Sequence, residues 1–165
     1  MTEKLTYEQA LDQLAQGKLV AREAWENLRF LFKTVDGKNQ DLEKFWAETK
    51  ILYHPVQYKD NLVYQMLQTD GGLYAPYIGI YSNRIATDWY VIDVDQLIRR
   101  VLWCIEYTAF KAYKAYYPNG DWFGLKAASA DSEAAEYNYK KWHDVGRAML
   151  VYSYQHVPLQ TEVKP

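Results

Sequence analysis

The spacing of apolar residues changes at Asp93, and this change limits what the chain can fold into. Before Asp93 the apolar residues form short runs between turn residues, which is typical of β-strands. After Asp93 they recur at helical spacing, from Leu97 to Tyr116 and again from Ala135 to Tyr152. The pattern predicts an α+β fold, in which a small, mostly antiparallel sheet with an N-terminal helix is followed by a C-terminal helical hairpin.

Turn residues set the predicted boundaries in the second half of the chain. The sequence Pro118-Asn119-Gly120 ends the first helix of the hairpin, because proline and glycine interrupt helices. A loop through Trp122 and Phe123 then leads to a second helix. The tail has no periodicity, which is typical of a flexible terminus. The predicted units are the α+β unit at 1–94, the helical hairpin at 95–156 and the flexible tail at 157–165.

Capping signals place the elements of the first unit. Thr6-x-x-Gln9 is a capping-box pattern, and Gly17 can adopt the left-handed conformation that ends a helix. The polar stretch at 39–50 has apolar residues at helical spacing and is predicted to be an inserted helix. We expect a helix over 6–15, strands over 19–22, 28–34 and 89–92, and a hairpin of 62–68 and 73–81 around Asp70-Gly71-Gly72.

The charge of the chain gives it no overall attraction to polyanions. Its formal net charge is −2, and its 49% of hydrophobic and 24% of charged residues are ordinary for a globular protein. We therefore expect no nucleic acid polymer as a partner. No apolar run approaches the length of a membrane span, and the N-terminus lacks the apolar core of a signal peptide. We expect no membrane partner and a cytoplasmic location.

Motifs of common enzyme and metal sites are missing from the sequence, which contains no HExxH, CxxC, GxSxG or GxxxxGKS/T pattern. His54, His143 and His156 are scattered, and Cys104 lies on an apolar helix face, where it is expected to behave as a small hydrophobe. We expect no catalytic residue, no metal and no cofactor, so the chain is interpreted as a protein without enzymatic activity. Carboxylates that lie far apart in sequence leave acid–base chemistry open.

Tyrosine and tryptophan are unusually frequent, with 16 and 6 residues. Their rings combine a wide apolar face with a polar group, which suits interfaces and pockets for flat ligands. The same rings also suit an ordinary core. Composition alone leaves both interpretations open.

Two blocks of the sequence resemble a known family. The first, YEQALDQLAQGKLVAREAW from Tyr7 to Trp25, combines an amphipathic helix, Gly-Lys, a small strand and Arg-x-x-Trp. The second, DGGLYAPYIGIYSNRIATDWYVI from Asp70 to Ile92, ends with Asp-Trp before an apolar strand. In this order the blocks resemble the second type of Thoeris anti-defence protein, a small phage-borne domain family. The chain differs from the family pattern at Ala24, Tyr77 and Asn83, where the family has glycine, tryptophan and aspartate.

The resemblance implies a phage anti-defence sponge. Such a protein binds a cyclic nucleotide immune signal, either a cyclic ADP-ribose isomer or a cyclic dinucleotide, and sequesters it without degrading it. It also implies a homo-oligomer with pockets between subunits. The helix at 39–50 and the chain after Asp95 exceed the compact family domain.

Six residues of the two blocks make a suitable set of ligand-binding groups. Aromatic faces stack bases, typically at ~1–3 kcal/mol per base. Arginine binds phosphate through two parallel hydrogen bonds, and Asn or Asp binds base edges or ribose hydroxyls. Structural roles compete for each residue: core packing for the tryptophans, a turn for Asn83 and a cap of backbone amides for Asp88. The candidates are Arg22, Trp25, Tyr77, Asn83, Asp88 and Trp89.

Two other functions remain as alternatives to the sponge. One is an enzyme that cleaves the cyclic nucleotide, since distant carboxylates can meet in a fold. The other is a non-catalytic interaction module, in which the aromatic-rich helical hairpin binds a host or virion protein. The sponge interpretation suits the missing nucleophile and metal motifs.

Overall fold

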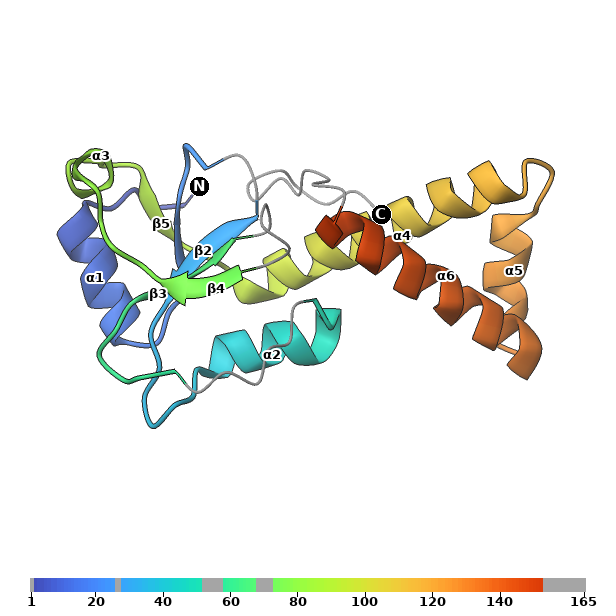
Figure 1. Cartoon of the computed structure of the whole chain (residues 1–165), viewed down its shortest axis with the longest axis horizontal. Helices are drawn as coiled ribbons and strands as arrows, with labels where there is room; N and C mark the ends of the chain where they lie inside the picture. The colour runs from blue at the N-terminus through green and yellow to red at the C-terminus, as the bar shows by residue number, and fades with distance from the viewer. Residues whose placement is uncertain (1, 26–27, 52–57, 68–72, 153–165) are drawn as a thin grey trace.

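The structure is a computed structural model that describes residues 2–25, 28–51, 58–67 and 73–152. The fold is α+β, as predicted from the change in apolar spacing. Figure 1 shows the sheet with its helices at one end of an elongated molecule, and α4 runs from the sheet toward α5 and α6. The elements are α1 (Tyr7–Ala15), β1 (Val20–Arg22), β2 (Arg29–Phe32), α2 (Gln40–Thr49), β3 (Tyr64–Leu67), β4 (Leu73–Pro76), α3 (Tyr81–Arg84), β5 (Trp89–Val91), α4 (Val94–Tyr116), α5 (Trp122–Ala128) and α6 (Glu133–Tyr152).

The five strands form one antiparallel sheet in the order β4-β3-β2-β1-β5. The pairing of β1 with β5 joins the two sequence blocks, because Arg22 lies opposite Trp89 in the register. On the other side of β1, Val20 lies opposite Leu31 of β2. The sheet therefore places the end of the first block beside the Asp-Trp pair of the second.

One face of the sheet packs on α2 and α4 and forms the main core. Phe30 and Phe45 meet edge to face, with 5.7 Å between ring centroids. Burying a side chain of this size stabilises the fold by roughly 1.5–3 kcal/mol. Strand residues alternate into this core because successive side chains of a strand point to opposite faces. The strand residues in it are Ala21, Phe30, Phe32, Tyr64, Met66 and Tyr90.

The opposite face packs on α1 over β1 and β5. The predicted capping box is confirmed: the Thr6 side chain accepts from the backbone N–H of Gln9, and the Thr6 N–H donates to the Gln9 side chain at 2.8 Å. Gly17 has a φ of 81°, as expected for the residue that ends this helix. The buried residues of this second cluster are Leu5, Ala10, Leu14, Val20, Leu31 and Trp89.

Helix α4 packs against the sheet through its first half and against α5 and α6 through its second half. Asp93 caps it, because its carboxylate accepts from the Gln96 N–H at 3.1 Å. In its first half Leu97, Val101 and Cys104 are buried in the same cluster as the sheet. Burial raises the pKa of the Cys104 thiol, which fits the predicted role as a small hydrophobe. The second half of α4 packs with α5 and α6.

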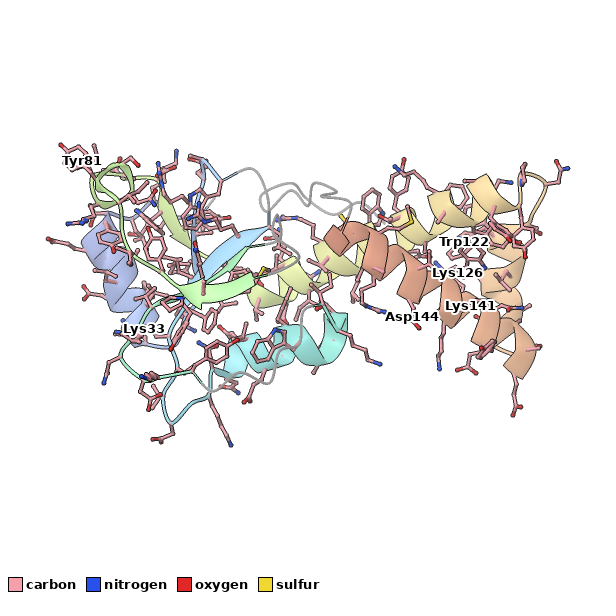
Figure 2. The ribbon with its side chains drawn as sticks, in the orientation of Figure 1. Lys33, Tyr81, Trp122, Lys126, Lys141 and Asp144 are labelled. Carbon is pink, nitrogen blue, oxygen red and sulfur yellow. The ribbon has the colours of Figure 1, made fainter. Side chains whose placement is uncertain are left out.

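Two predicted segments have a different structure. The run 73–81 was expected to be one strand, but β4 ends at Pro76, which has no N–H to continue the ladder, and Tyr81–Arg84 forms helix α3. The expected loop through Trp122 is helix α5, which begins because the Asp121 side chain accepts from the Gly124 N–H at 2.9 Å. Figure 2 shows Trp122 among the helices of this end, and it is 3% exposed.

Several predictions fall outside the described residues. These are the hairpin turn at 70–72, the tail at 157–165 and the histidines at 54 and 156, although the antiparallel pairing of β3 with β4 is confirmed. Among the described helices, none is both long and apolar enough to cross a lipid bilayer.

Gly146 lies where α4 and α6 cross and leaves no room for a larger side chain. A Cβ at Gly146 would lie 2.6 Å from the carbonyl oxygen of Ile105 and 2.7 Å from the backbone nitrogen of Ala109. Backbone atoms cannot yield as a flexible side chain does, so we expect Gly146→Ala to lower the free energy of unfolding by about 1–3 kcal/mol, as overpacking does. Urea denaturation measures this change.

The direction of the change in the free energy of unfolding serves as the control. At an exposed helical position, replacing glycine by alanine stabilises a helix by up to about 1 kcal/mol. A variant as stable as the original chain, or more stable, would show that α4 and α6 do not approach each other this closely.

Candidate functional site

Arg22 and Asp88 form an ion pair at the point where β1 ends and β5 begins. The Nε atom of Arg22 lies 2.8 Å from Oδ1 of Asp88, and the two side chains are 17% and 23% exposed. The other carboxylate oxygen of Asp88 accepts from the Ala24 N–H at 3.0 Å, and its backbone carbonyl accepts from the Glu23 N–H. Asp88 therefore holds both the guanidinium and the turn that follows β1.

Asn83 of α3 joins this pair to two aromatic residues. Its Oδ1 accepts from Nη1 of Arg22 at 2.8 Å, and its Nδ2 donates to the Tyr77 hydroxyl at 2.9 Å. Its backbone carbonyl accepts from the indole N–H of Trp89 at 3.1 Å. Asn83 is 5% exposed and does not have the positive φ of a turn residue, so the turn interpretation is wrong. Its position is explained by the hydrogen bonds that it makes.

The tryptophans pack beside this network. Trp89 is fully buried, with Tyr7 at 5.5 Å on one side and Trp25 at 5.3 Å in an edge-to-face contact on another. Trp25 is half-buried, and the guanidinium carbon of Arg29 lies 4.1 Å from the centre of its ring. Such a cation–π contact is worth ~0.5–2 kcal/mol. Trp25 is thus held between a buried indole and a cation.

The six candidate residues lie in one connected cluster. Arg22 contacts Asp88 and Asn83, Asn83 contacts Tyr77 and Trp89, and Trp25 packs on Trp89. The sequence prediction missed Arg29, which adds a second cation to this cluster. In the sequence, Arg29 alternates with Phe30 and so shares one face of its strand with Leu31. Whether Arg22 lies on the same face of the sheet depends on the pairing of β1 with β2.

Arg29 is partly buried and incompletely paired. Its Nη2 donates to the Gln65 side chain at 3.1 Å, whereas its Nε is buried and has no hydrogen-bond partner among the described residues. Burial lowers the pKa of Arg29; nearby Tyr77 opposes this shift, and the positive charge of Arg22 adds to it. Two cations therefore face the same space with one carboxylate, Asp88, bound to the first of them.

Burial and hydrogen bonding act on the pKa of Asp88 in opposite directions. Partial burial raises the pKa, but hydrogen bonds from Arg22 and from the Ala24 N–H, together with the charge of Arg22, outweigh burial and bring the pKa below its ordinary value. Burial also raises the pKa of the Tyr77 phenol. The carboxylate is therefore a stable anion at neutral pH, and the phenol stays protonated.

The fold and the cluster define a small α+β domain in which an Arg–Asn–Asp network supports aromatic residues on one sheet face. The family model of the Thoeris anti-defense 2-like (Tad2-like) domain matches residues 5–92, which is more than half of the chain. The chain belongs to this family, and its class of function is anti-defence against Thoeris immunity. No curated protein matches the chain. The matched range ends before α4.

The ion pair gives a prediction for stability and its pH dependence. We expect Asp88→Asn to lower the free energy of unfolding at pH 7 by roughly 1–3 kcal/mol, because hydrogen bonds to charged groups are lost in a partly buried site. The folded pKa of Asp88 lies below its unfolded value, so this stabilisation is present above the ordinary pKa, ~3.9, and is lost as the pH falls through the folded pKa. In urea denaturation, the difference in the free energy of unfolding between the original chain and the variant should become smaller from pH 7 to pH 3.

Asp95 supplies a matched control. Its carboxylate pairs with Lys44 at 2.5 Å, but the two side chains are 56% and 46% exposed. Exposed pairs contribute at most about 1 kcal/mol, so Asp95→Asn should have a clearly smaller effect. Equal losses in the two variants would contradict the role given to Asp88.

Proposed function

We propose that this domain is a phage anti-defence sponge. It binds a cyclic nucleotide immune signal, a cyclic ADP-ribose isomer or a cyclic dinucleotide, and sequesters it without degrading it. Binding uses Arg22, Arg29, Trp25 and Tyr77, while Asn83 and Asp88 hold Arg22 in position. Trp89 serves as the buried support of Trp25.

The ligand lies on the part of the sheet face over β2, β3 and β4. Helix α1 packs over β1 and β5, whereas several side chains on the same face of β2–β4, though not Leu31, keep part of their surface exposed. Arg29, Gln65 and Ala75 are all of this kind, and Tyr77 follows directly after β4. These groups provide a surface with two cations, two aromatic rings and an amide.

The incompletely paired guanidinium of Arg29 is the observation that carries the proposal. Buried donors in folded proteins are nearly always paired, and a buried cation is costly without a counter-charge. The buried Nε of Arg29 has no acceptor among the described residues. Arg22 donates to Asp88 and Asn83 through its Nε and Nη1, so its Nη2 takes no part in these two bonds. An anion between the two guanidinium groups would accept these N–H donors and relieve their repulsion. The phosphates of a cyclic nucleotide have this charge and geometry.

Aromatic groups at the same place suit the base. Trp25 is fixed by Trp89 behind it and by Arg29 over its ring, so stacking on it costs little further ordering. Tyr77 is held by Asn83 and has its hydroxyl on the side of the arginines. A stacked base typically contributes ~1–3 kcal/mol.

Sequestration without cleavage fits the state of the carboxylate. Both oxygens of Asp88 accept hydrogen bonds, and its pKa lies below the ordinary value. A general base works best with a pKa near the operating pH, so Asp88 is poorly suited to remove a proton from water. Its geometry suits the positioning of Arg22.

A patch of exposed apolar residues beside the cluster supports self-association. Ile78, Ile80, Tyr81 and Ile85 lie between Tyr77 and Asp88 in sequence and are 60–81% exposed. Figure 2 shows Tyr81 at the tip of the molecule that is remote from α5. Contiguous exposed apolar residues mark interaction sites. We infer that a second copy of the chain covers this patch, so that the ligand lies close to the interface between subunits.

Calorimetry with a cyclic ADP-ribose isomer and a cyclic dinucleotide tests the binding groups. We expect at least one ligand to bind, and we expect Arg29→Gln to weaken it at least about tenfold, because a charge-assisted hydrogen bond is worth roughly 1.5–3 kcal/mol. Arg99→Gln, at an exposed position of α4, is the matched control and should bind as the original chain does.

The fate of the ligand separates the sponge from the enzyme. After heat denaturation of the complex, mass spectrometry should recover the cyclic nucleotide intact. Recovery of hydrolysed product would favour the nucleotide-cleaving enzyme. A panel without any binding, together with a stable protein partner in a pull-down, would favour the interaction module.

Light scattering tests self-association. We expect the original chain to form an oligomer, and Ile78→Asp with Ile85→Asp to shift it to monomer, because two charges would be placed in an apolar interface. Val35→Asp is the control, since Val35 is 66% exposed in a turn elsewhere. A strictly monomeric original chain would contradict the proposed interface.

A further inference from the structure

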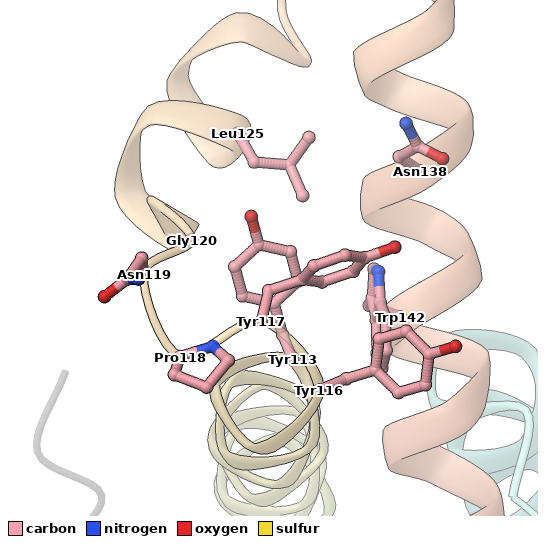
Figure 3. A pocket seen from close by; sticks show the side chains of 9 residues that line it. All are labelled: Tyr113, Tyr116, Tyr117, Pro118, Asn119, Gly120, Leu125, Asn138 and Trp142. Carbon is pink, nitrogen blue, oxygen red and sulfur yellow. The ribbon is translucent and has the colours of Figure 1, made fainter.

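A second site lies at the far end of α4, outside the residues that match the family. A cavity of about 510 Å³ opens there between the end of α4, α5 and α6 (Figure 3). Pockets for small molecules typically have volumes of roughly 300–1,000 Å³. Four aromatic rings gather at this cavity, those of Tyr113, Tyr116, Tyr117 and Trp142.

The rings contact one another and still keep accessible surface. Tyr113 meets Trp142 edge to face, with 5.5 Å between centroids, and Tyr116 meets Tyr117 at 5.0 Å. Tyr116 and Tyr117 are 72% and 49% exposed, although large aromatic side chains usually bury most of their area. Exposed aromatic surface around a hollow is typical of a binding site.

The loop 118–120 makes room for these rings and is held in place. A Cβ at Gly120 would lie 2.7 Å from both Cε1 and the hydroxyl of Tyr113, so the glycine is what allows this ring its position. The ammonium of Lys114 donates to the carbonyls of Pro118 at 3.0 Å and Gly120 at 2.9 Å. This part of the cavity wall is therefore preorganised by contacts within the chain.

The charge of the lining selects the ligand. No charged side chain lines the cavity, so a phosphate would lose its hydration without a counter-ion. A cation can pack on aromatic rings without a carboxylate, so the charge of the lining excludes anions only. The hydrogen-bonding groups of the lining favour an uncharged ring over a cation.

Hydrogen-bonding groups of the lining define the edge of that ligand. The exposed amide of Asn138 and the indole of Trp142 lie at the cavity, whereas the Asn119 side chain points away from the rings (Figure 3). An asparagine amide can donate and accept at once, which matches the edge of a purine. Leu125 adds an apolar contact from α5.

We propose that this cavity binds an uncharged purine nucleoside by stacking on the tyrosine and tryptophan rings, with the Asn138 amide on the base edge. This site is separate from the site proposed on the sheet face, where two arginines bind the phosphates of the signal. The chain then carries two sites of different chemistry, one for an anion and one for a neutral ring.

Nuclear magnetic resonance of the tryptophan indole N–H groups tests the site in the full chain. The signal of Trp142 is assigned by its loss in Trp142→Phe. We expect adenosine or guanosine to shift this signal saturably, and adenosine 5′-monophosphate to bind no more tightly than adenosine. Asn138→Ala should weaken binding at least fivefold, and Gly120→Ala should weaken it by displacing Tyr113.

Tyr137→Ala is the matched control, because Tyr137 is 71% exposed on the same helix and does not line the cavity. It should leave nucleoside affinity unchanged. The proposal is overturned if neither nucleoside shifts the Trp142 signal saturably, or if choline shifts it and the nucleosides do not. Tighter binding of the monophosphate, or full affinity in both Asn138→Ala and Gly120→Ala, would also overturn it.

Discussion

The hydrogen bonds of Arg22 are the interaction on which the domain depends. They join segments that are 61 and 66 residues apart, α3 through Asn83 and the start of β5 through Asp88. Through Asn83 they also hold Tyr77 and the buried indole of Trp89. One guanidinium thus fixes the turn after β1, the short helix α3 and the aromatic support of Trp25. The cost of partly burying this charge is offset because its partners are a carboxylate and an amide oxygen.

Local signals predicted most of the fold. The short apolar runs of β1, β2 and β5 and the capping box at Thr6 depend on neighbours along the chain, and all appear as expected. The short helices α3 and α5 were missed because helices of four and seven residues show little periodicity. Ile80 caps α3 without a side-chain hydrogen bond, and the seven residues of α5 are packed between two longer helices. Tertiary contacts decide such segments more than propensity does.

The candidate residues were predictable as a set, but their roles were not. Arg22 and Asp88 belong to two sequence blocks, and the antiparallel pairing of β1 with β5 brings them together. Asn83 looked like a residue that faces a ligand, yet its side chain is 5% exposed and bonded on both sides. Arg29 could not be identified from sequence, because its proximity to Arg22 depends on pairing across the sheet. Its buried Nε without an acceptor is visible only in three dimensions.

Under the proposed function, Arg29 and Arg22 bind the same anion. The most direct measurement is the nitrogen–proton signal of the Arg29 Nε, recorded without ligand and with a saturating cyclic ADP-ribose isomer or cyclic dinucleotide. We predict that the signal shifts and that its proton exchanges more slowly with water when the ligand is bound, while the signal of Arg99 stays unchanged. An Arg29 signal that remains unchanged at saturation would contradict the claim, because the phosphate would then be bound elsewhere.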